Sequence, residues 1–163
     1  MVLSDDFVLA YTDGSAIKQI RDKTKYHGGA GVVLIYKGKE KRISTPIEDG
    51  TNNISEITAA LIALQSLNKP CMVRVITDSQ YVIKGVTKWS VGWVRRGWRT
   101  ASGEPVKNAE LFKQLLDLCK RHDVTWEWVK GHNGDIYNEI ADELARKASA
   151  SLKEIEESEI GEC

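Results

Sequence analysis

Four acidic residues stand far apart along the chain, at positions where a fold could gather their carboxylates: Asp13, Glu56, Asp78 and Asp142. Asp13 and Asp78 each directly follow an apolar run with the pattern of a strand, whereas Glu56 and Asp142 lie on helical patterns. Hard divalent cations bind carboxylate oxygens, and a pair of Mg²⁺ ions can hold a phosphodiester for in-line attack. The four residues together therefore predict a metal-dependent nuclease.

Each of these residues also has an ordinary explanation when it is taken alone. Asp13 before Gly14 is typical of a turn, and Asp78 before Ser79 is typical of a helix N-cap. Glu56 suits the positive end of a helix dipole without any metal, and Asp142 fits a solvated helix face. The metal-site interpretation depends on the joint occurrence of all four.

The bulk composition fits one intracellular domain. The chain has 163 residues, enough for a self-sufficient core, and a formal net charge of zero. Three cysteines without a pairing motif, and no segment that resembles a signal peptide, predict a reducing, cytoplasmic setting. No apolar run approaches the length that spans a bilayer, so we expect no membrane partner.

The charge is unevenly distributed despite this balance. Residues 84–107 hold six Lys or Arg against one Glu, and residues 151–163 hold five Glu against one Lys. A basic surface on a neutral protein indicates a local polyanion site, and the acidic segment is most simply a solvated end. We therefore expect one domain over residues 1–150 and an acidic C-terminal tail over residues 151–163.

The order of the predicted elements indicates an α/β fold. We expect strands at about residues 7–13, 30–36, 41–45, 73–77 and 124–129. We expect helices that begin after Asn52-Asn53, at Ser79 and at Asn108, and a last helix at about residues 137–152. This order predicts one mixed five-stranded sheet with helices on both faces. The strands that lead to Asp13 and Asp78 should be parallel neighbours.

Five short motifs, in this order along the chain, resemble the type 1 ribonuclease H family of the bacterial kind. They are Tyr11-Thr12-Asp13-Gly14-Ser15, Thr51-Asn52-Asn53 leading to Glu56, Thr77-Asp78-Ser79-Gln80-Tyr81, residues 126–132 (WEWVKGH) and residues 138–145 (NEIADELA). The likeness covers roughly residues 5–150. Any one motif alone is weak, whereas the ordered set is specific.

The resemblance implies a ribonuclease H-like fold and an endonuclease that hydrolyses the RNA strand of RNA–DNA hybrids. Asp13, Glu56, Asp78 and Asp142 match the family's ligands for two Mg²⁺ ions, with Mn²⁺ as an alternative. In the family, one ion activates the attacking water and the other stabilises the leaving 3′-oxygen, which gives 5′-phosphate and 3′-hydroxyl ends. His132 matches a mobile histidine that assists proton transfer or product release.

The resemblance also implies a surface that binds the hybrid, in a protein that is expected to be a monomer. The positions that match minor-groove contacts, where the 2′-hydroxyl distinguishes RNA from DNA, are Thr51, Asn52, Asn53 and Gln80. The positions that match contacts to the DNA strand are Asn108 and, within a basic protrusion at about residues 88–104, Trp89, Trp93, Arg95 and Arg96. The tryptophans equally fit a small hydrophobic core that holds the protrusion together.

One segment departs from the family pattern. Residues 16–27 are longer than the short turn that family members have at this place, and they lack its asparagine. The candidates to contact a phosphate instead are Lys18, Arg21, Lys23 and Lys25, and charge reversal there should weaken hybrid binding. His27 and His122 have no motif around them and are expected to take no part in function.

Two other functions remain open from the sequence. Integrases, transposases and junction resolvases share an acidic cluster on a related fold, and a hybrid-binding module would keep the surface without turnover. The Thr51-Asn52-Asn53 motif argues against the first, and the complete set of carboxylates argues against the second.

Overall fold

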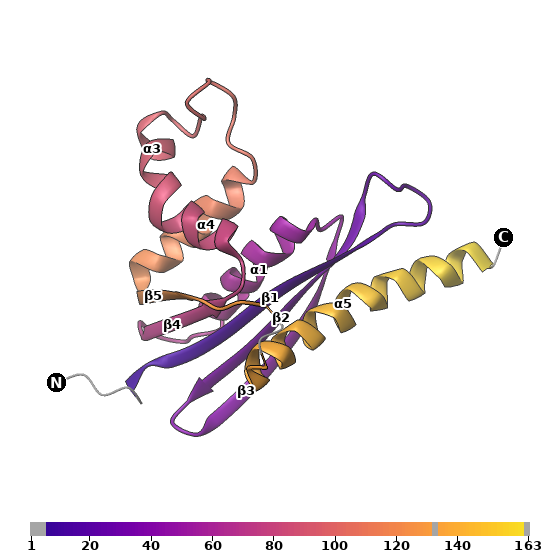
Figure 1. Ribbon diagram of the computed structural model, residues 1–163, viewed down its shortest axis with the longest axis horizontal. Coiled ribbons are helices and arrows are strands. Elements are labelled where there is room, and N and C mark those ends of the chain that lie inside the picture. The colour runs from indigo at the N-terminus through magenta and orange to yellow at the C-terminus, as the bar shows by residue number, and fades with distance from the viewer. Residues whose placement is uncertain (1–5, 132–133, 162–163) are drawn as a thin grey trace.

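The computed structural model describes residues 6–131 and 134–161, and one five-stranded sheet organises them (Figure 1). The strands are β1 (Val8–Lys18), β2 (Tyr26–Tyr36), β3 (Lys39–Glu48), β4 (Met72–Thr77) and β5 (Asp123–Trp128). The helical elements are α1 (Asn52–Gln65), α2 (Gln80–Lys84), a π-helical turn η2 (Gly85–Trp89), α3 (Ser90–Arg95), α4 (Ala109–Arg121) and α5 (Ile136–Gly161). Every strand that the sequence predicts is present.

The sheet is mixed, as predicted, with the strand order β3-β2-β1-β4-β5. β1, β2 and β3 form an antiparallel meander, and β4 pairs in parallel with both β1 and β5. Lys37 and Gly38 connect β2 to β3 with positive φ angles of 48° and 79°, which is the mirror-type turn that matches the twist of a hairpin. The predicted parallel pairing of the strands that lead to Asp13 and Asp78 is confirmed.

Helices α1 and α5 lie on opposite faces of the sheet, and glycines of β2 determine how closely they approach it. A Cβ atom on Gly29 or Gly31 would collide with backbone oxygens of α5, whereas a Cβ on Gly28 would press on Ser55 of α1. Successive residues of a strand point to opposite faces, so these contacts place one helix on each side. The backbone of α5 therefore lies directly against β2.

The hydrophobic core lies between the sheet and the helices on the α1 side. Its largest fully buried side chains include Ile57 and Leu64 of α1, Val75 of β4, and Phe112 and Leu115 of α4. This core fixes α1 and α4 relative to β1, which contains Asp13, and to the end of β4, which Asp78 follows.

The β1–β2 hairpin is longer than the sequence predicts. We expected a strand to end at Asp13 and the next to begin at residue 30, but the two strands stay paired as far as Lys18 and Tyr26. Asp13 thus lies inside β1 and does not end it, because β2 continues to supply hydrogen-bond partners. Residues 16–18 and 26–27 of the atypical segment are therefore regular strand, and residues 19–25 form the loop that connects them.

Helix α5 is also longer than predicted, and it includes most of the expected acidic tail. The helix was expected to end near Leu152, but it runs through Gly161. Glu156 is buried in its last turns, where it accepts hydrogen bonds from the backbone N–H groups of Ile20 and Arg21. The interpretation of this segment as a solvated end is therefore wrong for Glu156. Although α5 has 26 residues, neither it nor another described helix is apolar enough to cross a membrane.

Gly31→Ala is expected to lower the free energy of unfolding by about 2–3 kcal/mol, because the new methyl group meets backbone that cannot move without shifting α5. Gly161→Ala is the matched control, since a Cβ there meets nothing within 4 Å, and we expect a change below about 1 kcal/mol. Urea unfolding of both variants measures the difference. Equal stability of Gly31→Ala and the wild type would contradict the close seating of α5.

Candidate active site

Asp13 and Asp78 are brought together by the register of two parallel strands. The pairing of β1 with β4 ends at Tyr11 and Ile76, and each aspartate lies two residues further along the chain, Asp13 within β1 and Asp78 just after β4. The two residues therefore occupy equivalent positions at the same edge of the β1–β4 pair. Asp13 is buried and Asp78 is partly exposed, so the site opens to solvent on the Asp78 side.

Glu56 joins this pair from α1. The backbone N–H of Gly14 donates to Glu56 Oε1, and it also donates to Asp13 Oδ1 over 2.9 Å. A Cβ at residue 14 would lie 2.7 Å from the backbone carbon of Ser55, so only glycine permits this approach. One carboxylate oxygen from each of Asp13, Glu56 and Asp78 then lies within 4.8 Å of the others. Such a set of oxygen ligands suits a divalent cation.

Asp142 lies beside this cluster. It follows Ala141, whose carbonyl oxygen sits over Gly31, and Gly31 is the strand partner of Asp13. Its carboxyl interacts with that of Asp13, while its Oδ2 also pairs with Arg146 Nη2 at 2.9 Å, one turn along α5. The structure therefore brings Asp13, Glu56 and Asp78 together from separate elements, with Asp142 in interaction with Asp13. That the four residues bind metal stays a prediction.

The electrostatics of the cluster are unfavourable without a cation. Burial raises the pKa of Asp13 to about 7, against the effect of its hydrogen bond with Glu56, and the charge of Asp78 adds to the rise. Burial, followed by the charge of Asp13, also raises the pKa of Glu56 well above its ordinary value. Both carboxyls resist ionisation here, and a bound divalent cation would remove that resistance.

Two residues that the sequence did not single out as functional hold the chain against Asp78. Trp128 Nε1 donates to the backbone oxygen of Asp78 over 3.2 Å, and a Cβ on Gly131 would lie 2.8 Å from Asp78 Oδ2. The motif WEWVKGH contained both, but its alternating pattern did not reveal what they contact. His132, the next residue, was expected to have a catalytic role, and it lies outside the described residues.

The expected minor-groove residues lie together near α1. A cavity of about 500 Å³ is lined by Thr51, Asn52, Asn53 and Asn108, together with Ala16, Tyr26 and Lys107. Thr51 Oγ1 accepts from the backbone N–H of Ile54, so Thr51 is the N-cap of α1, and the helix begins at Asn52, two residues earlier than the start after Asn53 that we expected. Asn108 has a φ of 61°, which asparagine tolerates, and donates to the Tyr81 hydroxyl over 3.1 Å. Gln80 is exposed at the start of α2.

The tryptophans of the expected protrusion form a chain of ring contacts. The Trp93 ring centroid lies 6.0 Å from that of Trp89, 5.9 Å from that of Trp98 and 5.1 Å from that of Phe112. Trp93 and Trp98 pack against the main core, whereas Trp89 is 37% exposed. The small hydrophobic core that we considered is therefore present, and contact of these rings with a DNA strand stays a prediction.

The expected basic residues of the protrusion keep their charges at the surface. Arg95 and Arg96 are exposed, and Arg96 Nε donates to the backbone oxygen of Arg99 over 2.9 Å. This bond orients the Arg96 side chain without neutralising it. Both remain suited to phosphate contact.

Comparison with known proteins gives one consistent family. A family model described as RNase H matches residues 5–150. A ribonuclease H of Stutzerimonas stutzeri (strain A1501) is 46% identical over 151 residues, which cover 93% of this chain and 97% of that protein. The crystal structure of LC9-RNase H1, a type 1 RNase H with the type 2 active-site motif, superposes with a TM-score of 0.77 at 29% identity, covering 93% of this chain and 75% of that one. A foamy viral protease-reverse transcriptase in complex with RNA/DNA hybrid superposes with a TM-score of 0.80 at 25% identity, covering 93% of this chain and 21% of that one.

Asp13→Asn is expected to stabilise the metal-free protein at pH 8 by about 1–3 kcal/mol. Because folding raises the pKa of Asp13 from 3.8 to about 7, the contribution of Asp13 to stability is largest below about pH 4 and is lost as the pH rises from about 4 through 7. Asparagine does not ionise, so the variant should not lose this contribution. Urea unfolding in EDTA at pH 5 and pH 8 measures the free energy of unfolding of both proteins.

The matched control is Asp117→Asn, which makes the same change at a side chain that is 79% exposed on α4, and we expect little effect there. A metal-free Asp13→Asn protein that is less stable than the wild type at pH 8 would contradict a site of crowded, buried carboxylates.

Proposed function

The chain belongs to the RNase H family, as a type 1 member of the bacterial kind, and we propose that it is an endonuclease that hydrolyses the RNA strand of RNA–DNA hybrids with two bound Mg²⁺ ions. The observation that carries this proposal is the convergence of Asp13, Glu56 and Asp78, whose carboxylate oxygens lie within 4.8 Å of one another. We propose Asp142, beside Asp13, as the fourth ligand.

The residues present suit Mg²⁺, and Mn²⁺ is the alternative. The available donors are carboxylate oxygens, which hard cations prefer, and their raised pKa values favour a site that gains from added positive charge. When bound, the two ions would activate the attacking water and stabilise the leaving 3′-oxygen, which gives 5′-phosphate and 3′-hydroxyl ends.

The protein's own groups prepare this chemistry by fixing the ligands. The N–H of Gly14 holds the Asp13 and Glu56 carboxylates in place, and Trp128 holds the backbone at Asp78. Since these donors are backbone or ring N–H groups in the packed structure, the carboxylates need little rearrangement when a cation arrives. We propose that His132, the residue that follows Gly131 in the sequence, moves a proton or assists release of the product.

Substrate recognition is coupled to the site through short stretches of chain. Asn52 and Asn53 lie one helical turn before Glu56 on α1, and Gln80 lies two residues after Asp78. A nucleic acid strand that contacts these amides therefore passes over the carboxylates. We propose that they read the minor groove, where the 2′-hydroxyl identifies the RNA strand.

The protrusion would hold the other strand of the hybrid. Asn108, Arg95, Arg96 and the exposed Trp89 are proposed contacts to the DNA strand. A monomeric state and a cytoplasmic location stay predictions from the sequence.

Mg²⁺ is expected to raise the melting temperature of the wild type. At roughly ten times the dissociation constant, a cation that binds only the folded state adds about 1.4 kcal/mol of stability. Asp78→Asn removes one ligand and should reduce the shift. Thermal melts in EDTA and in Mg²⁺ give the change in melting temperature for the wild type and for Asp78→Asn. An equal change in both proteins would mean that Mg²⁺ binds at a site that does not include Asp78.

The function itself is tested by cleavage of a labelled RNA–DNA hybrid in Mg²⁺, with duplex RNA and duplex DNA in parallel. The wild type should cut only the RNA of the hybrid, and Asp78→Asn should be slower by about a thousandfold or more with its circular dichroism unchanged. Analysis of the product termini checks the expected end chemistry. Tight binding without cleavage would indicate a binding module, and cleavage of duplex DNA would indicate the integrase-like alternative.

A further inference from the structure

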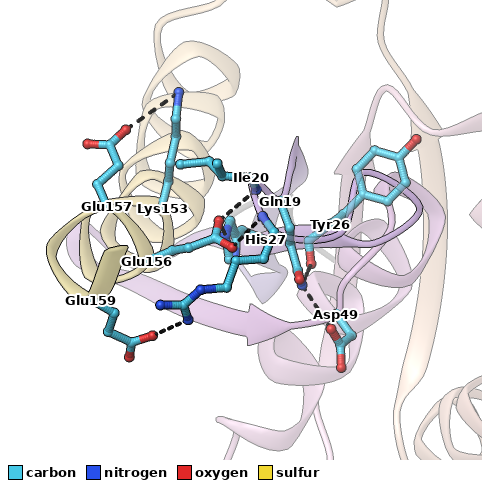
Figure 2. Close-up of polar contacts among 10 residues, drawn as sticks. Gln19, Ile20, Tyr26, His27, Asp49, Lys153, Glu156, Glu157 and Glu159 are labelled. Atoms are coloured by element: carbon cyan, nitrogen blue, oxygen red, sulfur yellow. Dashed lines mark hydrogen bonds and ion pairs between the residues drawn. The ribbon is translucent and has the colours of Figure 1, made fainter. Parts of the chain in front are cut away.

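The tip of the β1–β2 hairpin, residues 16–27, is held firmly by the end of α5 (Figure 2). We call these residues the hairpin arm. Glu156 Oε1 accepts from the backbone N–H of Ile20 at 2.8 Å and contacts His27 Nε2 at 2.8 Å, and its Oε2 accepts from the backbone N–H of Arg21 at 3.0 Å. These contacts, the Ile20 N–H first, lower the pKa of Glu156 to about 2. Glu156 is thus a buried, charged anchor.

Two expectations from the sequence change as a result. His27 was expected to take no part in function, but it is a partner of Glu156 and so helps to hold the arm. Arg21 was a candidate for phosphate contact, but its guanidinium pairs with Glu159 at 2.7 Å. Of the four basic candidates in the arm, Arg21 is therefore the least suited to bind substrate.

The arm is also tied on the side away from α5. Gln19 Nε2 donates to the backbone oxygen of Tyr26 at 3.1 Å and to Asp49 Oδ1 at 2.9 Å. Asp49 lies in the short connection that leads from β3 into Thr51 and α1. This second tie fixes the arm relative to the cavity that Thr51, Asn52 and Asn53 line.

The strand register determines which side chains of the arm face that cavity. Lys18 pairs with Tyr26, and Ala16 pairs with Gly28, whose Cβ direction is toward α1. Paired residues share a face, as do residues two apart along a strand, so Lys18 lies on the cavity side with Ala16 and Tyr26. His27 lies on the α5 side, and Figure 2 shows the Tyr26 ring pointing away from α5.

The cavity face of the arm carries the charge that a nucleic acid backbone requires. Lys18 is exposed and forms no ion pair with any residue of the described ranges 6–131 and 134–161. Lys107 lines the same cavity from the segment before α4. The carboxylate of Asp49, next to the arm, accepts a hydrogen bond from the Gln19 amide.

We propose that the hairpin arm is a further substrate-binding element, in which Lys18 and Tyr26 contact the sugar–phosphate backbone of the hybrid and Glu156 is the positioning residue that holds them there. The inference rests on the proposed hybrid substrate. The Lys18 ammonium supplies charge, and the Tyr26 hydroxyl supplies a hydrogen-bond donor to a phosphate oxygen. Because the arm is anchored before binding, little conformational entropy is lost when it engages.

The first test compares Lys18→Gln with Lys153→Gln in steady-state cleavage of a labelled hybrid. Lys153→Gln is the control because it also removes one positive charge, but from α5, where Lys153 pairs with Glu157. Lys18→Gln should raise KM about three- to tenfold with kcat unchanged, and should make the slope of log affinity against log salt shallower by about 0.9. Lys153→Gln should change neither quantity.

The second test asks whether Glu156 acts through the arm. Glu156→Gln should raise KM and leave kcat unchanged, and adding Lys18→Gln to it should have less effect than Lys18→Gln alone. If Glu156→Gln does not fold, Gln19→Ala releases the other tie and gives the same readout. Fully additive effects of Lys18→Gln and the released anchor would overturn the role of Glu156.

The outcomes separate this inference from the proposed function. If the wild type cuts the hybrid and Lys18→Gln has the same KM and salt dependence as Lys153→Gln, substrate binding by the hairpin arm is overturned, whereas the proposed ribonuclease activity stands. A wild type that leaves the hybrid uncut would overturn the proposed function. Fluorescence anisotropy with the same hybrid would then still show whether Lys18 contributes to binding.

Discussion

The burial of mutually repelling carboxylates is the constraint on which the rest of this structure depends. Asp13 and Glu56 are almost inaccessible to solvent and share one small volume with Asp78, so the protein must hold charges that would separate in a looser fold. It does so with rigid parts: two parallel strands in register, a helix locked against Gly14, and a tryptophan bonded to the backbone at Asp78. The scaffold keeps in place an arrangement that becomes favourable once a cation arrives.

Close contact between helix and sheet is the means by which the last carboxylate joins the others. Gly29 and Gly31 let the backbone of α5 lie directly on β2, and Gly31 is the strand partner of Asp13. A side chain on either glycine would push the helix outward and carry Asp142 away from Asp13. The lack of a Cβ atom at Gly29 and Gly31 of β2 thus determines how closely Asp142 on α5 approaches Asp13 on β1.

The sequence predicted what depends on local pattern and failed where distant contacts decide. The five strands, the parallel pair and the convergence of the acidic residues followed from alternation and from motifs in order. The extent of the β1–β2 hairpin and of α5 did not, because each is stabilised by the other through Glu156, and nothing near Glu156 in the sequence distinguishes it from its acidic neighbours. The start of α1 was expected two residues too late, because Thr51, Asn52 and Asn53 are adjacent and each can serve as an N-cap.

Helix α5 carries both Asp142 and Glu156, so it sets the distance between the acidic cluster and the anchor of the hairpin arm. Glu156 is 14 positions after Asp142, which corresponds to about 21 Å along a straight helix at 1.5 Å per residue. Glu156 contacts the arm and not the substrate, so this length fixes where the arm is anchored relative to the acidic cluster. Under the proposed function, a hybrid too short to extend from the carboxylates to Lys18 would be bound without the help of the arm.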